Sequence, residues 1–306
     1  MREKLWLFGV LAIMGAGWGA TQPLAKIAVS EGYRHFGLIF WQLVIGAVLL
    51  GLFRAFRGAA GWWPRTDRPA LLVYLLIALI GTVLPNSTSY EAARHLPAGL
   101  ISILLSLVPL FAFPIALALG NEKFSVARAA GLGLGLAGVI LIVAPEASLP
   151  ERAMVAFIPI ALIAPLFYAA EGNIVARWGT AGLSPVDVLF GASIVGALVA
   201  LPLALVTGQF IVPRTPFEAP DWSLIASSII HVIVYTTYVW LVGRAGAVFA
   251  VQVSYLVTGF GVIWAMIFLG ERFSGWIWIA MILILSGVAL VQPRPRLDQT
   301  PATGET

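Results

Sequence analysis

The residues in this chain that could do chemistry are ionisable side chains inside long apolar runs. Glu171 stands in the apolar run 154–176, and His231 stands near the centre of the run 222–242. Because an ionised group in hydrocarbon costs several kcal/mol, such residues usually face a cavity or a partner. Both side chains can bind a proton, so both are candidates for proton coupling within a membrane. Structural alternatives stay open: Glu171 could pair with Arg177 or reach the inner membrane interface, and His231 could be a neutral, hydrogen-bonded interior residue.

Aromatic and amide side chains supply further candidates for ligand binding. Tyr235 and Tyr238 are three residues apart and His231 precedes Tyr235 by four, so these three share one helical face. Such side chains offer π faces with hydrogen-bonding tips, which suit an amphiphilic solute with an apolar body. Helix–helix packing is the structural alternative. The other candidates within apolar runs are Trp18, Gln22, Trp41, Gln42, Asn86, Tyr90, Tyr168, Gln252 and Tyr255.

The composition indicates whether the chain lies in water or in a membrane. Hydrophobic residues make up 60% of the chain and charged residues only 10%, whereas roughly a quarter of an average soluble domain is charged. The chain is therefore predicted to be a polytopic membrane protein. The net charge of +4 comes from short connections between apolar runs, so we expect no nucleic-acid partner.

Counting apolar runs against the roughly 20 residues that a bilayer-spanning helix needs predicts an all-α protein with ten transmembrane helices. Strands are not expected, because the runs show no alternation of polar and apolar residues. The first run is too long for a cleaved signal peptide. The predicted spans are 5–29, 36–53, 70–90, 98–119, 126–144, 154–176, 185–206, 222–242, 248–269 and 276–291.

One stretch occurs twice, half a chain apart, from Leu119 to Pro145 and from Leu269 to Pro293. A charged turn followed by an apolar run, given twice, indicates an internal duplication. At an offset of 149 residues, the aligned pairs are Glu122 with Glu271, Phe124 with Phe273, Ser125 with Ser274, Gly138 with Gly287, and Gln22 with Glu171. The predicted units are a first repeat at 1–148, a second repeat at 149–293 and a disordered cytoplasmic tail at 294–306.

Lys and Arg residues predict the orientation of the chain. With the N-terminus inside, twelve basic residues fall in inner segments and five in outer ones, so both termini are expected to be cytoplasmic in an inner membrane. Because each repeat has five spans, Glu122 then lies on the cytoplasmic side of the membrane and Glu271 on the opposite side. The two repeats are thus expected to be inverted, as in alternating-access transporters whose substrate site lies near the membrane midplane.

The chain resembles the ten-span EamA group of the drug/metabolite transporter superfamily over about residues 5–292. The resemblance rests on a set of short motifs: Trp18-Gly19 with Pro23 and Lys26, Tyr90 with Pro97-Ala98-Gly99, Pro109, Gly120 to Glu122, the Glu271 turn and Gly287. It implies a carrier of small organic solutes, often an exporter of amino acids or related metabolites. Where many relatives carry an arginine early in span two, this chain has Trp41-Gln42.

Several charged residues have structural interpretations. Glu122 and Glu271 each precede a predicted helix, at Ser125 and Ser274, and are expected to cap its N-terminal dipole. Lys26 could extend to the nearby membrane interface.

Other residues are assigned to packing and helix mechanics. Glu91 and Arg94 are expected to form an interfacial ion pair. Gly131, Gly135 and Gly138 share a face that would let a neighbouring helix approach closely. Helix interruptions are expected at Pro23, Pro85, Pro109, Pro114, Pro159, Pro165 and Pro202.

Together these patterns predict a secondary transporter that moves a small metabolite, such as an amino acid or related amphiphile, as an exporter. A proton-coupled or facilitative importer is the alternative within this class. An intramembrane enzyme or a scaffold is the alternative outside it, but three scattered histidines and no cysteines supply neither a nucleophile–base pair nor clustered metal ligands. We therefore expect no enzyme activity, cofactor or metal. The expected partners are the bilayer, a small substrate and protons, and the sequence leaves the oligomeric state open.

Overall fold

The computed structural model describes residues 2–57, 63–145, 148–213, 215–245, 247–250 and 252–291. Within these residues every regular element is a helix, which confirms the predicted all-α class. The predicted tail at 294–306 lies outside them. The elements are α1 (Arg2–Ser30), α2 (His35–Phe56), α3 (Arg68–Ala78), η1 (Leu79–Val83), α4 (Leu84–His95), α5 (Ala98–Leu105), α6 (Val108–Ala118), α7 (Val126–Val143), η2 (Arg152–Phe157), α8 (Ile158–Trp178), α9 (Pro185–Val206), α10 (Ala219–Ala245), α11 (Ala247–Ala250), α12 (Val253–Leu269) and α13 (Gly275–Val291).

The helices form ten apolar stretches in the described residues, at the positions that the sequence predicted. Eight are long and apolar enough to cross a membrane, and α12 and α13 are shorter apolar helices. Three of the eight are composite: α3 continues through η1 into α4, α5 is followed by α6, and η2 leads into α8. The ten-helix membrane fold is thus confirmed.

Large apolar side chains cover the outside of the bundle. Ile13, Leu136, Leu198 and Ile267 are each more than 60% exposed, on four different helices. Such a surface is unfavourable in water and favourable against lipid tails. The outer faces of these helices therefore suit a hydrocarbon environment.

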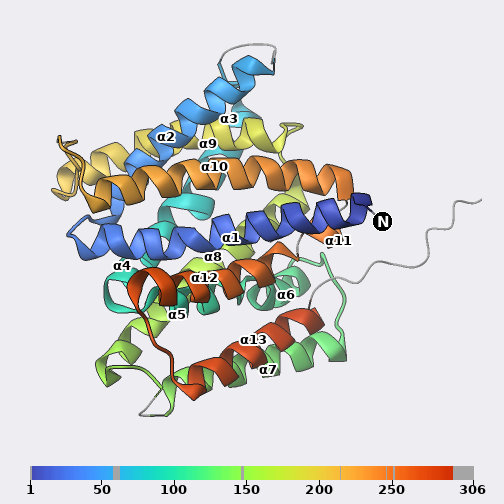
Figure 1. Cartoon of the computed structure of the whole chain (residues 1–306). Helices are drawn as coiled ribbons and strands as arrows, with labels where there is room; N and C mark the ends of the chain where they lie inside the picture. The colour runs from blue at the N-terminus through green and yellow to red at the C-terminus, as the bar shows by residue number, and fades with distance from the viewer. Residues whose placement is uncertain are drawn as a thin grey trace, which may run out of the picture.

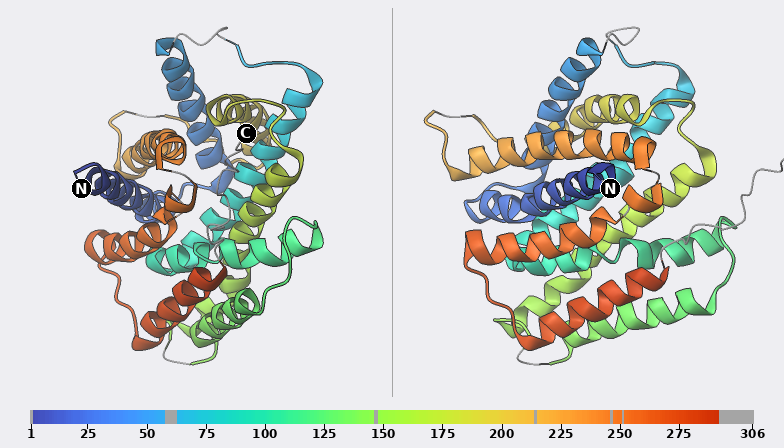
Figure 2. Two further views of the ribbon diagram at one scale, coloured as in Figure 1. Left: turned by 90° about the vertical axis from the view of Figure 1, so that its right-hand side faces the viewer. Right: turned by 45° about the vertical axis from the view of Figure 1, so that its right-hand side comes forward.

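Helices from distant parts of the chain lie side by side (Figures 1 and 2). α1 packs against α10 and α12, α2 against α9, and α4 against α8, while α7 and α13 form a pair at one edge. The connection before α7 and the connection before α13 lie at opposite ends of the bundle, and α1 begins at the same end at which α13 finishes (Figure 1). This arrangement is the one expected of inverted repeats, a relation that stays a prediction.

The α7–α13 pair confirms the close approach predicted from glycine. A Cβ atom on Gly131 would lie 2.7 Å from the Gly287 carbonyl oxygen, and one on Gly287 would lie 2.5 Å from the Gly131 carbonyl oxygen. A Cβ on Gly138 would meet Ile284 at 2.6 Å. Since real Cβ atoms do not approach backbone so closely, these positions require glycine.

Proline behaves differently from the prediction. Pro23, Pro165 and Pro202 lie inside continuous helices, as does Pro114 in α6, so the expectation of an interruption at each was wrong. Proline lacks only one hydrogen bond, and neighbouring helices can accommodate the freed carbonyl group. The remaining prolines occupy the first turns of α4, α6 and α8, where a missing N–H costs nothing.

Candidate functional site

A hydrogen-bonded network joins three helices in the interior of the bundle. The Tyr90 hydroxyl donates to Gln42 Oε1 at 2.8 Å, and the Asn86 amide donates to the same oxygen at 3.4 Å. The Tyr168 hydroxyl donates to Asn86 Oδ1 at 2.7 Å. We call these four residues the polar network. It links α2 and α4, from the first half of the chain, to α8 in the second half.

Local sequence explains how the network is built. Asn86 and Tyr90 are four residues apart in α4, so they present their polar groups on one face. Gln42 in α2 can accept from both of them, and Tyr168 reaches Asn86 from α8. Because lipid offers no partners for polar groups, mutual hydrogen bonding stabilises these side chains inside the bundle.

A second group is aromatic and lies between α1 and α10. The Trp18 ring meets the His231 ring at a centroid distance of 6.0 Å and the Tyr238 ring at 6.1 Å, both edge to face. The His231 and Tyr235 rings are 6.4 Å apart and nearly parallel, at 20°. We call Trp18, His231, Tyr235 and Tyr238 the aromatic cluster. The predicted shared face of His231, Tyr235 and Tyr238 therefore faces α1.

Glu171 is an electrostatic neighbour of both groups, through Tyr168 in the polar network and Tyr235 in the aromatic cluster. Among the ion pairs of the described residues there is none between Glu171 and Arg177, so the predicted pairing is not realised.

The carboxylate of Glu171 rests against a glycine in an irregular turn. A Cβ atom on Gly81 would lie 2.5 Å from Glu171 Oε1 and 2.8 Å from Oε2, so only glycine leaves room for the carboxylate where it stands. Gly81 belongs to η1, a π-helical segment of five residues between α3 and α4. Segments of this kind occur frequently at functional sites.

The other four predicted site residues have no contact with these two groups in the interactions described above. Gln22 follows Trp18 by one turn of α1 and is partly buried. The Trp41 indole donates to the Ile211 carbonyl at 2.8 Å and is thus tied to the α9–α10 connection. Gln252 stands at the start of α12, and Tyr255 packs against the main apolar core. The structure therefore brings eight of the predicted residues into two groups of four, and Glu171 is an electrostatic neighbour of both groups.

The two repeated glutamates, each predicted to cap the helix that follows it, make different contacts. Glu271 accepts from the backbone N–H groups of Ala98 at 2.6 Å and Gly99 at 3.0 Å, so it caps α5 and not α13. Glu122 pairs with Arg128 in the first turns of α7 at 2.8 Å. For Glu271 the prediction was wrong, because the helix N-terminus that it meets belongs to a segment distant in sequence. Glu122 stays beside the first turn of the helix that follows it, so its interaction with that helix dipole remains a prediction.

Lys26 makes a contact that the sequence did not predict. Its ammonium group donates to the Ala93 carbonyl at 2.7 Å and lies 3.5 Å from the Arg94 carbonyl, at the C-terminal end of α4. Carbonyl groups at a helix C-terminus lack intrahelical partners and attract a cation. Lys26 therefore joins α1 to α4.

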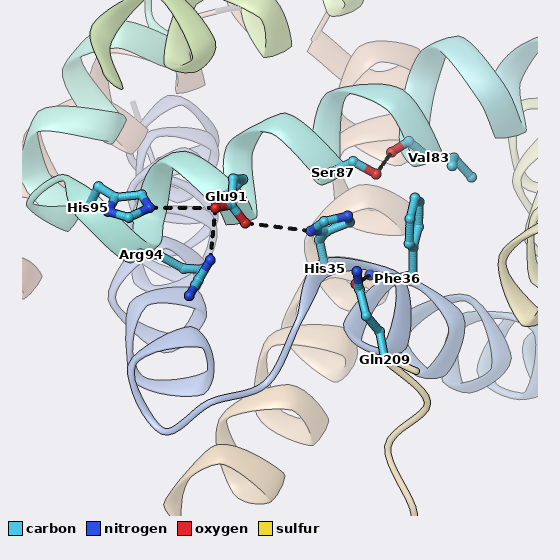
Figure 3. Close-up of polar contacts among 8 residues, drawn as sticks. All are labelled: His35, Phe36, Val83, Ser87, Glu91, Arg94, His95 and Gln209. Atoms are coloured by element: carbon cyan, nitrogen blue, oxygen red, sulfur yellow. Dashed lines mark hydrogen bonds and ion pairs between the residues drawn. The ribbon is translucent and has the colours of Figure 1, made fainter. Parts of the chain in front are cut away.

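A charged cluster that the sequence revealed only in part lies where the end of α4 meets the start of α2 (Figure 3). The predicted Glu91–Arg94 pair is confirmed at 2.8 Å. His95 lies 3.5 Å from the same carboxylate, and His35, at the start of α2, lies 3.7 Å from its other oxygen. The four-residue spacing of Glu91 and His95 could have indicated their contact, but the approach of His35 depends on tertiary packing.

Asn173 is a further interior residue that sequence reasoning missed. Its amide donates to the carbonyls of Ala112 at 3.0 Å and Ala169 at 2.9 Å, and so fastens α8 to α6. In the described residues no three His, Cys, Asp or Glu side chains gather to hold a metal ion.

These observations define an all-helical, multi-pass membrane protein whose interior polar residues come from both halves of the chain. The chain belongs to the EamA-like transporter family, which it matches over residues 5–144 and 156–292, and thereby to the drug/metabolite transporter superfamily. It is a membrane transporter.

Two individual proteins resemble the chain over most of its length. A protein from Streptantibioticus cattleyicolor, named "Probable terminal-alkyne amino-acid exporter", is 24% identical over 303 residues, which cover 96% of this chain and 95% of the relative. A crystal structure described only as that of a protein matches with a TM-score of 0.60 at 18% identity, over 92% of this chain and 95% of that chain. The structural likeness supports the fold alone.

Proposed function

We propose that this transporter exports a small amphiphilic metabolite, such as an amino acid or a related amine, by alternating access. The solute binds between the polar network and the aromatic cluster, and Glu171 couples its movement to a proton. The observation that carries the proposal is that Glu171 is an electrostatic neighbour of two groups, each built from both halves of the chain. The name of the Streptantibioticus relative favours export of an amino acid.

The chemistry of the two groups matches the parts of such a solute. The aromatic rings of Trp18, Tyr235 and Tyr238 present π faces to an apolar body, and they also attract an ammonium group. The amides and hydroxyls of the polar network can exchange their mutual hydrogen bonds for bonds to a polar solute. Such an exchange keeps the polar groups satisfied whether or not solute is bound.

Glu171 is the residue best placed to carry the proton. It is a carboxyl group inside a membrane span, near the proposed solute position and without an ion-pair partner among the described residues. A proton bound from one side and released to the other would link solute movement to the proton gradient. His231, in the aromatic cluster, is the second candidate for this role.

The experiment uses purified protein in liposomes loaded with unlabelled solute. A panel of amino acids and amines is first ranked by thermal shift, and labelled forms of those that stabilise the protein are then supplied outside. Saturable counterflow is expected for at least one of them. Flux that rises linearly without saturation would indicate a channel, and chemical conversion of the solute would indicate an enzyme; either result contradicts the proposal.

The direction of transport requires a separate measurement in cells. Cells that overproduce an exporter should hold less of the solute and tolerate more of it than cells without the protein. Greater accumulation inside the cells would favour the importer and contradict export.

A further inference from the structure

The hydroxyl group of Tyr168 has two candidate acceptors. In this structure it donates its proton to Asn86 Oδ1 at 2.7 Å, and this bond joins α8 in the second half of the chain to α4 in the first. Glu171 is three residues further along α8, so it shares a face of that helix with Tyr168 and is its electrostatic neighbour. A phenol has a single proton to donate. Tyr168 can therefore donate to Asn86 or to Glu171, but not to both at once.

The rest of the polar network orients the Asn86 amide. Gln42 Oε1 accepts from the Asn86 amide nitrogen at 3.4 Å and from the Tyr90 hydroxyl at 2.8 Å. The amide nitrogen of Asn86 is thus directed at α2, and its oxygen is left to accept from Tyr168. If Tyr168 stops donating, Asn86 Oδ1 loses its partner in α8. The Tyr168–Asn86 bond is therefore the contact through which the polar network reaches the second half of the chain.

The protonation state of Glu171 decides which acceptor is favoured. A protonated carboxyl group can donate its own proton to the Tyr168 oxygen, and Tyr168 then keeps its bond to Asn86. An ionised carboxylate can only accept, and a hydrogen bond to an ionised acceptor is roughly twice as strong as one between neutral groups. An ionised Glu171 therefore favours donation from Tyr168 and weakens the bond between α8 and α4.

The other neighbours of Glu171 leave this competition in place. Tyr235 of α10 is a second hydroxyl group on which Glu171 acts, but a carboxylate has two oxygens and can accept from both phenols. Gly81 of η1 presents no side chain to the carboxylate. Among the described residues, no charged side chain acts electrostatically on Glu171. An ionised Glu171 therefore depends on hydroxyl donors such as Tyr168 for stabilisation inside the bundle.

We propose that Tyr168 is a positioning residue that transmits the protonation state of Glu171 to the contact between the two halves of the chain. The proposal rests on the proposed proton coupling by Glu171. With Glu171 protonated, the Tyr168–Asn86 bond of this structure is kept, and the polar network joins α8 to α4 and α2. With Glu171 ionised, Tyr168 leaves Asn86, and α8 separates from α4. A proton that binds at Glu171 thereby shifts the protein between two conformations, as alternating access requires.

The test measures the separation of α4 and α8 directly and needs no solute. Because the chain contains no cysteine, Leu84→Cys in α4 and Leu166→Cys in α8 introduce a single pair of thiols, both at exposed positions. Spin labels are attached to the two thiols in purified protein. Pulsed electron paramagnetic resonance then gives the distribution of distances between the labels, in lipid nanodiscs at acidic and at alkaline pH.

In this labelled parent, the ratio of joined to separated populations is expected to fall about tenfold from acidic to alkaline pH, since a charged hydrogen bond replaces a neutral one. Two variants should abolish this change and leave the protein in opposite states. Glu171→Gln keeps an N–H donor for the Tyr168 oxygen at every pH, so the joined population should dominate throughout. Tyr168→Phe removes the hydroxyl group, so the separated population should dominate throughout. If the Tyr168 hydrogen bond were merely structural, Tyr168→Phe would favour separation but keep the change with pH.

Tyr90→Phe is the matched control. It also removes one hydroxyl group from the polar network, but the bonds of Asn86 to Tyr168 and to Gln42 stay in place, so the change with pH should remain. Size-exclusion elution and thermal unfolding confirm that each variant is folded. Any of three results would overturn the role of Tyr168: no change with pH in the parent, the full change in Tyr168→Phe, or an equal loss of the change in Tyr90→Phe.

The outcome is separable from that of the proposed function. If counterflow is absent for every solute while the label distances respond as expected, transport of these solutes is disproved and the role of Tyr168 stands. If counterflow is saturable but the label distances do not change with pH, the proposed transport stands and the role of Tyr168 is disproved.

Discussion

Gly81→Ala tests whether the exact position of Glu171 matters for coupling. The new Cβ atom would lie 2.5 Å from Glu171 Oε1, 2.6 Å from its Cδ and 2.8 Å from Oε2. An ordinary contact needs at least 3.4 Å, so the carboxylate must move by about 1 Å. The atoms that clash are the end of a flexible side chain, and we therefore expect a stability change of no more than about 1 kcal/mol.

The functional consequence should be larger than the structural one. Misplacing a functional group by about 1 Å can cost up to about a hundredfold in rate. We expect the ratio of pH-gradient-driven accumulation to solute exchange, both measured in liposomes, to fall about tenfold. Gly172→Ala is the matched control, because a Cβ atom on this neighbour of Glu171 meets nothing within 4 Å, and its ratio should stay unchanged.

A double variant identifies the cause. If Gly81→Ala acts by displacing the carboxylate, it should have no further effect on coupling in a Glu171→Gln background. Two results would refute the reasoning: an unchanged ratio in Gly81→Ala, or the same fractional loss with and without the Glu171 carboxylate.

The remaining predictions concern packing, recognition and topology. Gly287→Ala places a Cβ atom 2.5 Å from the Gly131 carbonyl oxygen, so thermal unfolding should show a loss of stability of about 1–3 kcal/mol. Gly133→Ala is the control: its Cβ atom would meet nothing within 4 Å, so stability should not change. Equal losses in the two variants would contradict the close α7–α13 packing. The His231→Ala, Tyr235→Ala double variant should raise the KM for counterflow about threefold to tenfold, since aromatic contacts are worth about 0.5–1.5 kcal/mol beyond burial. Unchanged kinetics would show that the aromatic cluster is not part of the substrate site. Reporters at both termini should be active in the cytoplasm, because basic residues favour that side twelve to five, and periplasmic activity at the C-terminus would contradict the orientation.

Composition and run length were sufficient to predict the fold, because a bilayer leaves few alternatives to helices of about 20 residues. The span predicted at 185–206 coincides with α9. The glycine face of α7 was predicted to lie close to a neighbouring helix, and that neighbour is α13 at Gly131 and Gly138. Helix spacing alone also predicted that His231, Tyr235 and Tyr238 share a face.

Contacts between distant segments could not be predicted in the same way. Glu271 was assigned to the helix that follows it, but it caps α5. The contact of Lys26 with the end of α4 was likewise not predicted. Each depends on which helix ends meet in space, and a single sequence does not encode that directly. The π-helical turn around Gly81, which leaves room for Glu171, likewise has no local sequence signature beyond glycine.

The most direct test of the account compares the normal protein with Glu171→Gln, which keeps the shape of the side chain and removes its titration. Both proteins, reconstituted in liposomes, are assayed for exchange of labelled solute and for accumulation driven by an imposed pH gradient, with Glu151→Gln on an exposed residue as the control. The account predicts that Glu171→Gln still exchanges solute but loses the driven accumulation. Intact driven accumulation, or loss of exchange and binding together with it, would contradict the role of Glu171 as the proton-coupling residue.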